Sequence, residues 1–111
     1  MYHIMYEYKA NVIKVYDGDT ITVDIDLGFG IVLTNQVLRL YGINTPEVRG
    51  EEKEEGKKVR DLLREEILHK DITIRTIKDK KGKYGRWLAI IIHEEKNIND
   101  WLLNEGYAKP Y

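Results

Sequence analysis

Hydrophobic and polar residues alternate along the first forty residues in the way expected of β-strands. Residues 11–16 and 21–27 are rich in β-branched side chains, and every second residue of the later segment is apolar. This two-residue period predicts a half-buried strand. The Asp-Gly-Asp-Thr sequence at residues 17–20 separates the two segments and favours a turn or bulge. After a flexible Gly-Phe-Gly reversal at residues 28–30, residues 31–41 are expected to return as a third strand.

The period changes to that of a helix at residues 51–68. The apolar positions of this segment fall on one stripe, which contains Gly56, Val59, Leu62, Leu63 and Ile67. The basic residues nearby alternate with glutamates, so we interpret them as a solvated helix face: Arg49, Lys53, Lys57, Lys58 and Arg60.

Two further strands and a second helix are predicted in the last forty residues. Residues 71–77 and 87–93 again have strand character. A short helix fits residues 98–105, with Asn97 as its N-cap and Gly106 as its stop.

The order of elements is therefore three strands, a helix, two strands and a helix. This order predicts a mainly β protein with α-helices (α+β): a five-stranded OB-fold Greek-key barrel, with a helix between strands three and four and a C-terminal helix. A mixed α+β sheet with the same element order is also compatible with the periodicity. The length of 111 residues suits one domain covering residues 1–111.

The composition indicates the class of protein but says little about its function. Hydrophobic residues make up 42% and charged residues 33% of the chain, which is typical of a globular domain. There are no cysteines, so disulfides and thiolate metal sites are excluded. No apolar run reaches membrane-spanning length, and residues 1–10 lack the apolar core of a secretory signal. We therefore expect no membrane partner and a cytoplasmic location, with secretion of a processed form as the alternative. A monomer is the starting expectation.

The overall charge says little about nucleic acid. Eighteen Lys and Arg residues nearly balance nineteen Asp and Glu residues, giving a formal charge of −1. Affinity for phosphate would have to come from local clusters. The clearest such cluster contains Lys78, Lys80, Lys81, Lys83 and Arg86.

Three short stretches place arginines and carboxylates at predicted strand ends: residues 17–20, 39–47 and 83–86. Hydrolysis of a phosphodiester needs cations that hold the phosphate and a carboxylate that directs water at phosphorus. Arg39 lies between Leu38 and Leu40, so it projects from the opposite face of an apolar strand. A partly buried arginine needs an anionic partner, which is either a protein carboxylate or a ligand phosphate.

Together with residues 99–109, these stretches resemble the staphylococcal nuclease family, the calcium-dependent, thermonuclease-like domains built on an OB barrel. The resemblance covers almost the whole chain. It implies hydrolysis of DNA or RNA, with a single strand as the expected substrate, to give a 3′-phosphate and a 5′-hydroxyl. It also implies a Ca²⁺ ion, for which hard oxygen ligands are suited. Those ligands would be Asp19, Asn44 and the backbone carbonyl of Thr45.

The same resemblance assigns the remaining site residues. Arg39 and Arg86 would hold the scissile phosphate from two sides, since guanidinium groups suit bidentate contacts with phosphate. Glu47 would act as the general base or orient the attacking water. Lys83 and Tyr84 would contact a neighbouring phosphate and nucleotide.

Two departures from the family pattern affect these expectations. The family usually has an aspartate at the position of Asn44, so the metal site loses one negative charge and should bind Ca²⁺ more weakly. Asp17, two residues before Asp19, would offset part of that loss. The path from Glu47 to the predicted helix is also short, so the cleft should be open on that side.

Two function classes follow from these residues. The first is a calcium-dependent nuclease. The second is a nuclease-like OB module that binds nucleic acid or protein without cutting it. Retention of Asp19, Arg39, Glu47 and Arg86 favours the enzyme, and Asn44 argues against it. A sugar-binding OB domain ranks third, because nothing there requires paired arginines. The sequence does not distinguish DNA from RNA.

Overall fold

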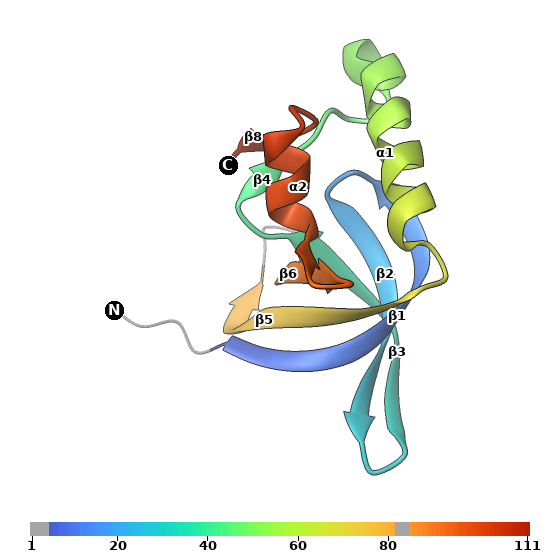
Figure 1. The fold of residues 1–111 in the computed structure, drawn as a ribbon, viewed down its shortest axis with the longest axis vertical. Coiled ribbons are helices and arrows are strands. Elements are labelled where there is room, and N and C mark those ends of the chain that lie inside the picture. Colours follow the sequence, from blue (N-terminus) through green and yellow to red (C-terminus); the bar gives the residue numbers. More distant parts are fainter. Residues whose placement is uncertain (1–4, 82–84) are drawn as a thin grey trace.

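A computed structural model describes residues 5–81 and 85–111. Five long strands and two helices form its framework (Figure 1). The strands are β1 (Met5–Asp17), β2 (Thr20–Gly28), β3 (Ile31–Leu40), β5 (Asp71–Lys81) and β6 (Trp87–His93). A 3₁₀ turn (Gly50–Glu52) leads into helix α1 (Lys53–Ile67), and helix α2 (Ile98–Asn104) follows β6. The short strands are β4 (Ile43–Asn44), β7 (Lys96–Asn97) and β8 (Lys109–Pro110).

The five long strands close into a barrel. Their order is β3-β2-β1-β5-β6, and neighbouring strands are antiparallel. The barrel closes where β3 and β6 run parallel, with Leu38 opposite Trp87 and Leu40 opposite Ala89. A closed mixed barrel with one helix between β3 and β5 and another after β6 confirms the predicted OB-fold-like α+β class.

Strand β1 is bent by two irregularities. Its register against β2 shifts between Val12 and Lys14, and again between Val15 and Asp17. Such bulges add a residue to one strand and increase its local twist. They allow β1 to pair with β2 through its second half and with β5 through its first half.

The alternation at residues 21–27 correctly predicts that Ile21, Val23 and Ile25 face the interior of the barrel, whereas Leu27, at the end of β2, is 41% exposed. Leu38 is also fully buried, as are Ile74 and Ile91 on the opposite wall. Removal of these branched side chains from water supplies the main driving force for folding. The barrel therefore has a single hydrophobic core.

Helix α1 packs against β1 through the predicted apolar stripe. Gly56, Val59, Leu63 and Ile67 are buried, whereas Leu62 is only half-buried. The helix is amphipathic because its polar residues occupy the remaining positions of the 3.6-residue period.

The predicted boundaries of helix α2 are close to those observed. The side chain of Asn97 accepts a hydrogen bond of 3.0 Å from the N–H of Asp100, as expected of an N-cap. Gly106 has a φ of 79°, which suits glycine in the turn that follows the helix. Among the described residues, no helix has the length and hydropathy needed to cross a membrane.

The first strand is longer than predicted. We expected it to begin at residue 11, but β1 begins at Met5 and pairs with β5, placing Tyr6 opposite Thr76 and Tyr8 opposite Ile74. Tyr6 remains 43% exposed, so the segment carries little of the inward apolar signal that marks the other strands. Its strand conformation depends on pairing with β5, which is distant in sequence.

Gly56 allows helix α1 to lie directly against the loop that follows β4. A Cβ atom built on Gly56 would lie 1.9 Å from the carbonyl oxygen of Glu47 and 2.8 Å from the amide nitrogen of Val48. Backbone atoms cannot move aside as a flexible side chain can. The loop bearing Glu47 is therefore positioned by a helix residue that has no side chain.

We expect Gly56→Ala to lower the free energy of unfolding by about 1 to 3 kcal/mol, because the added methyl group forces the helix and the loop apart. Urea denaturation monitored by circular dichroism measures this change. Lys58→Ala, on the exposed side of the same helix, is the control and should change stability little. Equal stability of Gly56→Ala and the wild type would contradict the close packing.

Candidate functional site

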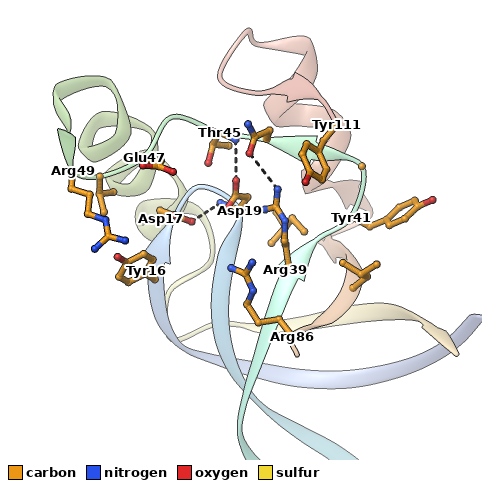
Figure 2. Close-up of a pocket in the computed structure, with 15 residues that line it drawn as sticks. Tyr16, Asp17, Asp19, Arg39, Tyr41, Thr45, Glu47, Arg49, Arg86 and Tyr111 are labelled. Atoms are coloured by element: carbon orange, nitrogen blue, oxygen red, sulfur yellow. Dashed lines mark hydrogen bonds and ion pairs between the residues drawn. The ribbon is translucent and has the colours of Figure 1, made fainter. Parts of the chain in front are cut away.

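A cleft of about 620 Å³ opens beside the β1–β2 turn, where β3 and β6 meet (Figure 2). It brings together six of the eight residues predicted from the sequence to form the site. They are Asp19, Arg39, Asn44, Thr45, Glu47 and Arg86. The other two, Lys83 and Tyr84, lie outside the described residues.

The turn at residues 17–20 presents Asp19 to this cleft. An oxygen of the Asp17 side chain accepts a hydrogen bond of 3.0 Å from the N–H of Asp19, an arrangement that stabilises Asp-rich turns. Gly18 packs tightly, since a Cβ atom there would lie 2.7 Å from Val59 and 2.8 Å from Thr45. The predicted turn is thus held against both helix α1 and the loop after β4.

The carboxylate of Asp19 is buried, and Arg39, Thr20 and Thr45 donate hydrogen bonds to it. Its Oδ1 lies 3.0 Å from Nη1 of Arg39 and accepts a hydrogen bond of 3.2 Å from the hydroxyl of Thr20. Its Oδ2 accepts a hydrogen bond of 3.0 Å from the backbone N–H of Thr45. Asp19 therefore links the start of β2, strand β3 and the loop after β4.

Arg39 contacts more than Asp19. Its Nη2 donates to the carbonyl of Ile43 at 3.2 Å and to Oδ1 of Asn44 at 3.3 Å. The ring of Tyr111 lies 5.0 Å from its guanidinium carbon, within the range of a cation–π contact. The sequence left open whether the anionic partner of this arginine is a carboxylate or a phosphate. In this structure it is the carboxylate of Asp19.

Arg86 enters the cleft from the start of β6. Because β3 and β6 pair in parallel, with Arg39 opposite Leu88, both arginines reach the same part of the cleft. Nη1 of Arg86 donates a hydrogen bond of 3.1 Å to the hydroxyl of Thr20, which itself contacts Asp19. Figure 2 shows both guanidinium groups pointing toward Asp19.

Glu47 lies at another side of the cleft, on the loop held by Gly56. Its side chain is exposed, and its backbone N–H donates to Oε1 of Glu52 at 3.4 Å. The carboxylate is thus available to water and to a bound molecule. The open approach here agrees with the short connection to the helix.

The two aspartates of the turn have opposite pKa shifts. Burial is the main factor that raises the pKa of Asp17 to about 7, and repulsion from Asp19 adds to it. Burial acts in the same direction on Asp19. Hydrogen bonds from the Thr45 N–H and from Asp17, together with the positive charge of Arg39, outweigh it and hold the pKa of Asp19 below its usual range. The pair therefore carries close to one negative charge below neutral pH.

The predicted metal ligands form a set of oxygen donors that suits a hard cation. No group of three or more His, Asp or Glu side chains that could hold a metal occurs within the described part of the chain. The predicted set instead combines one carboxylate, the amide oxygen of Asn44 and a backbone carbonyl. Oxygens of Asp19 and Asn44 already converge on one positive group, the guanidinium of Arg39. Their positions therefore fit a cation.

Among the other residues that line the cleft are an arginine and three tyrosines that were not predicted as site residues: Tyr16, Tyr41, Arg49 and Tyr111. Arg49 was interpreted as part of a solvated helix face, but it precedes the 3₁₀ turn and faces the cleft. The sequence signal for Tyr16 was its position next to the Asp-Gly-Asp turn. Tyr111 is positioned by long-range contacts, including a hydrogen bond of 3.0 Å from its N–H to the carbonyl of Gly42.

The raised pKa of Asp17 predicts a pH-dependent stability. Above its ordinary pKa of 3.8, the unfolded chain releases this proton while the folded protein keeps it up to about pH 7. Stability is therefore lost across this window as pH rises. Asp17→Asn keeps an oxygen acceptor for the Asp19 N–H and has no proton to lose. At pH 8 its free energy of unfolding should therefore exceed that of the wild type by about 1 to 2 kcal/mol, a value reduced for solvent screening.

Urea denaturation at pH 4 and pH 8 in a chelating buffer measures this difference. The gain should appear at pH 8 and be small at pH 4. Glu105→Gln removes an exposed carboxylate outside the cleft and is the control. An equal gain from Asp17→Asn at both pH values would contradict the assignment.

Comparison with known proteins agrees with this geometry. The model of the staphylococcal nuclease homologue family matches residues 37–111. A thermonuclease of Staphylococcus hyicus is 32% identical over 106 residues, covering 93% of this chain and 59% of the relative. A thermonuclease of Staphylococcus intermedius is 29% identical over 99 residues, covering 86% of this chain and 55% of the relative.

An uncharacterized endonuclease of Haemophilus influenzae is 28% identical over 102 residues, covering 92% of this chain and 52% of the relative. The chain thus spans between about half and three fifths of the length of these three relatives. The family match includes Arg39, Asn44, Thr45, Glu47 and Arg86, and alignment with the thermonucleases extends over most of the barrel. The chain belongs to the staphylococcal nuclease homologue family.

Proposed function

We propose that this protein is a calcium-dependent nuclease that hydrolyses phosphodiester bonds of single-stranded DNA or RNA and leaves 3′-phosphate ends. The observation that carries the proposal is the shared cleft of Arg39, Arg86, Glu47 and Asp19. Its family relatives include proteins named thermonuclease and endonuclease, which supports the same reaction class.

The two arginines supply the charge that the reaction needs. They approach the centre of the cleft from neighbouring strands, β3 and β6. If a phosphate is held between them, the two guanidinium groups offset the negative charge that builds up on its oxygens as a nucleophile attacks. The planar guanidinium of each arginine also fixes the orientation of the phosphate.

Glu47 provides the proton acceptor. A water molecule beside its exposed carboxylate would attack phosphorus, transfer a proton to Glu47, and break the bond from phosphorus to the 5′-oxygen. The 5′-oxygen leaves as a hydroxyl after gaining a proton from solvent. The phosphate stays on the 3′-oxygen of the other fragment.

Asp19, Asn44 and the carbonyl of Thr45 would hold the calcium ion. When bound, such an ion draws electron density from a phosphate oxygen and adds positive charge to the site. Arg39 contacts the oxygens of Asp19 and Asn44 in this structure, so it would have to turn away from them if they held the ion. Arg39 would then be available to a phosphate, and binding of the cation and of the substrate would favour each other.

A module that binds nucleic acid without cutting it is the second candidate. It is favoured by one observation, the amide of Asn44 at a position where a carboxylate would bind calcium more strongly. This candidate predicts strand binding with no hydrolysis at any calcium concentration.

The experiment that tests the proposal compares Glu47→Gln with the wild type in cleavage of a single-stranded oligonucleotide, with Ca²⁺ and with chelator. The wild type should cut only with Ca²⁺. Glu47→Gln keeps the shape of the side chain but accepts no proton, so turnover should fall on the order of 10²-fold or more, while binding of a nucleotide bisphosphate changes little.

Glu51→Gln is the matched control, because Glu51 is an exposed glutamate on the adjoining 3₁₀ turn that does not line the cleft. It should cut at the wild-type rate. Binding without hydrolysis by the wild type would establish the second candidate. Joint loss of binding and turnover in Glu47→Gln would make Glu47 a residue that supports the loop.

A further inference from the structure

The cleft extends on both sides beyond the two arginines at its centre. Asp19, Arg39 and Arg86 lie in the middle of Figure 2, and Tyr41 and Tyr111 lie at one end. The opposite end carries Tyr16 and Arg49, to which the proposed reaction gives no role. A strand cut at an internal bond must continue on both sides of the scissile phosphate, so each end of the cleft is a place for a nucleotide.

The backbone directs Tyr16 toward this end. Val15 pairs with Ile21 and Asp17 pairs with Thr20, which leaves Tyr16 as the extra residue of a bulge in β1. Bulges change the direction of a side chain and are common beside active sites. The ring of Tyr16 is 46% exposed and lines the cleft. A flat aromatic surface of this kind is suited to stacking with a base.

Arg49 places a positive charge at the same end. Figure 2 shows Arg49 and Tyr16 at the same end of the cleft, with Glu47 between this end and the centre. Within residues 5–81 and 85–111, Arg49 makes no hydrogen bond or ion pair through its side chain, and it gives none to cap the 3₁₀ turn that follows. Its charge is therefore available to a bound anion.

From this arrangement, we infer that Tyr16 and Arg49 form a nucleotide subsite on the Glu47 side of the scissile phosphate. Tyr16 stacks with the base, and Arg49 holds the next phosphate of the strand. The inference rests on the proposed function and extends it. A base can stack on Tyr16 only when it is free of its partner strand, so the subsite selects single strands longer than one nucleotide.

The test measures binding of fluorescein-labelled hexathymidylate by anisotropy with Ca²⁺. Glu47→Gln serves as the parent protein because it cuts slowly, and strand integrity is checked on a gel. Tyr16→Ala and Arg49→Ala should each weaken hexamer binding about tenfold, as expected for loss of one stacked base or one phosphate contact. Tyr16→Phe keeps the ring and should restore affinity. Thymidine 5′-monophosphate, which fills only the centre, should compete equally well in all variants.

Salt dependence separates the two roles. Arg49→Ala should lower the slope of log affinity against log salt by about 0.7, the contribution of one phosphate contact on a single strand. Tyr16→Ala should leave that slope unchanged. The controls are Tyr6→Ala, an equally exposed tyrosine away from this cleft, and Lys58→Ala, an exposed cation that does not line it.

Unchanged hexamer affinity in Tyr16→Ala and Arg49→Ala would overturn the subsite and leave the proposed function intact. Equal losses for hexamer and mononucleotide would also overturn it, because both residues would then shape the centre. Failure of both the Glu47→Gln parent and the wild type to bind either ligand with Ca²⁺ would contradict the proposed function itself, and the subsite with it.

Discussion

The ion pair between Asp19 and Arg39 is the interaction on which the rest of the site depends. It is buried, with 9% exposure of the Asp19 side chain and 12% of the Arg39 side chain. The carboxylate also accepts the backbone N–H of Thr45 at 3.0 Å. Loss of either charge would leave the other desolvated without an oppositely charged partner, which is costly. The β1–β2 turn, strand β3 and the loop after β4 are therefore fixed relative to one another through one carboxylate.

The same interaction sets a condition on the proposed reaction. Arg39 now contacts the oxygens of Asp19 and Asn44 that would hold the cation. A guanidinium and a metal ion cannot occupy both oxygens at once. A cation at Asp19 would therefore release Arg39, and a phosphate that attracted Arg39 would leave the carboxylate free. Because this coupling is a free energy, it acts equally in both directions. Because Asn44 carries no charge, it adds less attraction for a metal ion than an aspartate would. The metal ion and the guanidinium of Arg39 therefore compete for these oxygens more evenly.

Much of the fold could be predicted from the sequence, because the signals were local. The alternation at residues 21–27, the cap at Asn97 and the turn at residues 17–20 each act through near neighbours in the chain. The predicted site residues that are described do meet in one cleft. What could not be predicted depends on contacts between distant segments. The placement of Tyr16 needs a bulge defined by β2, and the pKa of Asp17 depends on how far the fold buries it.

Calcium affinity, measured by titration calorimetry without nucleotide, tests the competition between Arg39 and the cation most directly. Arg39→Met removes the group that occupies the oxygens, so it should bind Ca²⁺ about tenfold or more tightly than the wild type. Arg86→Met removes a positive charge from the same cleft. Because Arg86 contacts Thr20 rather than Asp19, this substitution should change the Ca²⁺ affinity much less. Addition of a nucleotide bisphosphate should tighten Ca²⁺ binding more in the wild type than in Arg39→Met. Equal gains in the two variants, or no gain in Arg39→Met, would contradict the account.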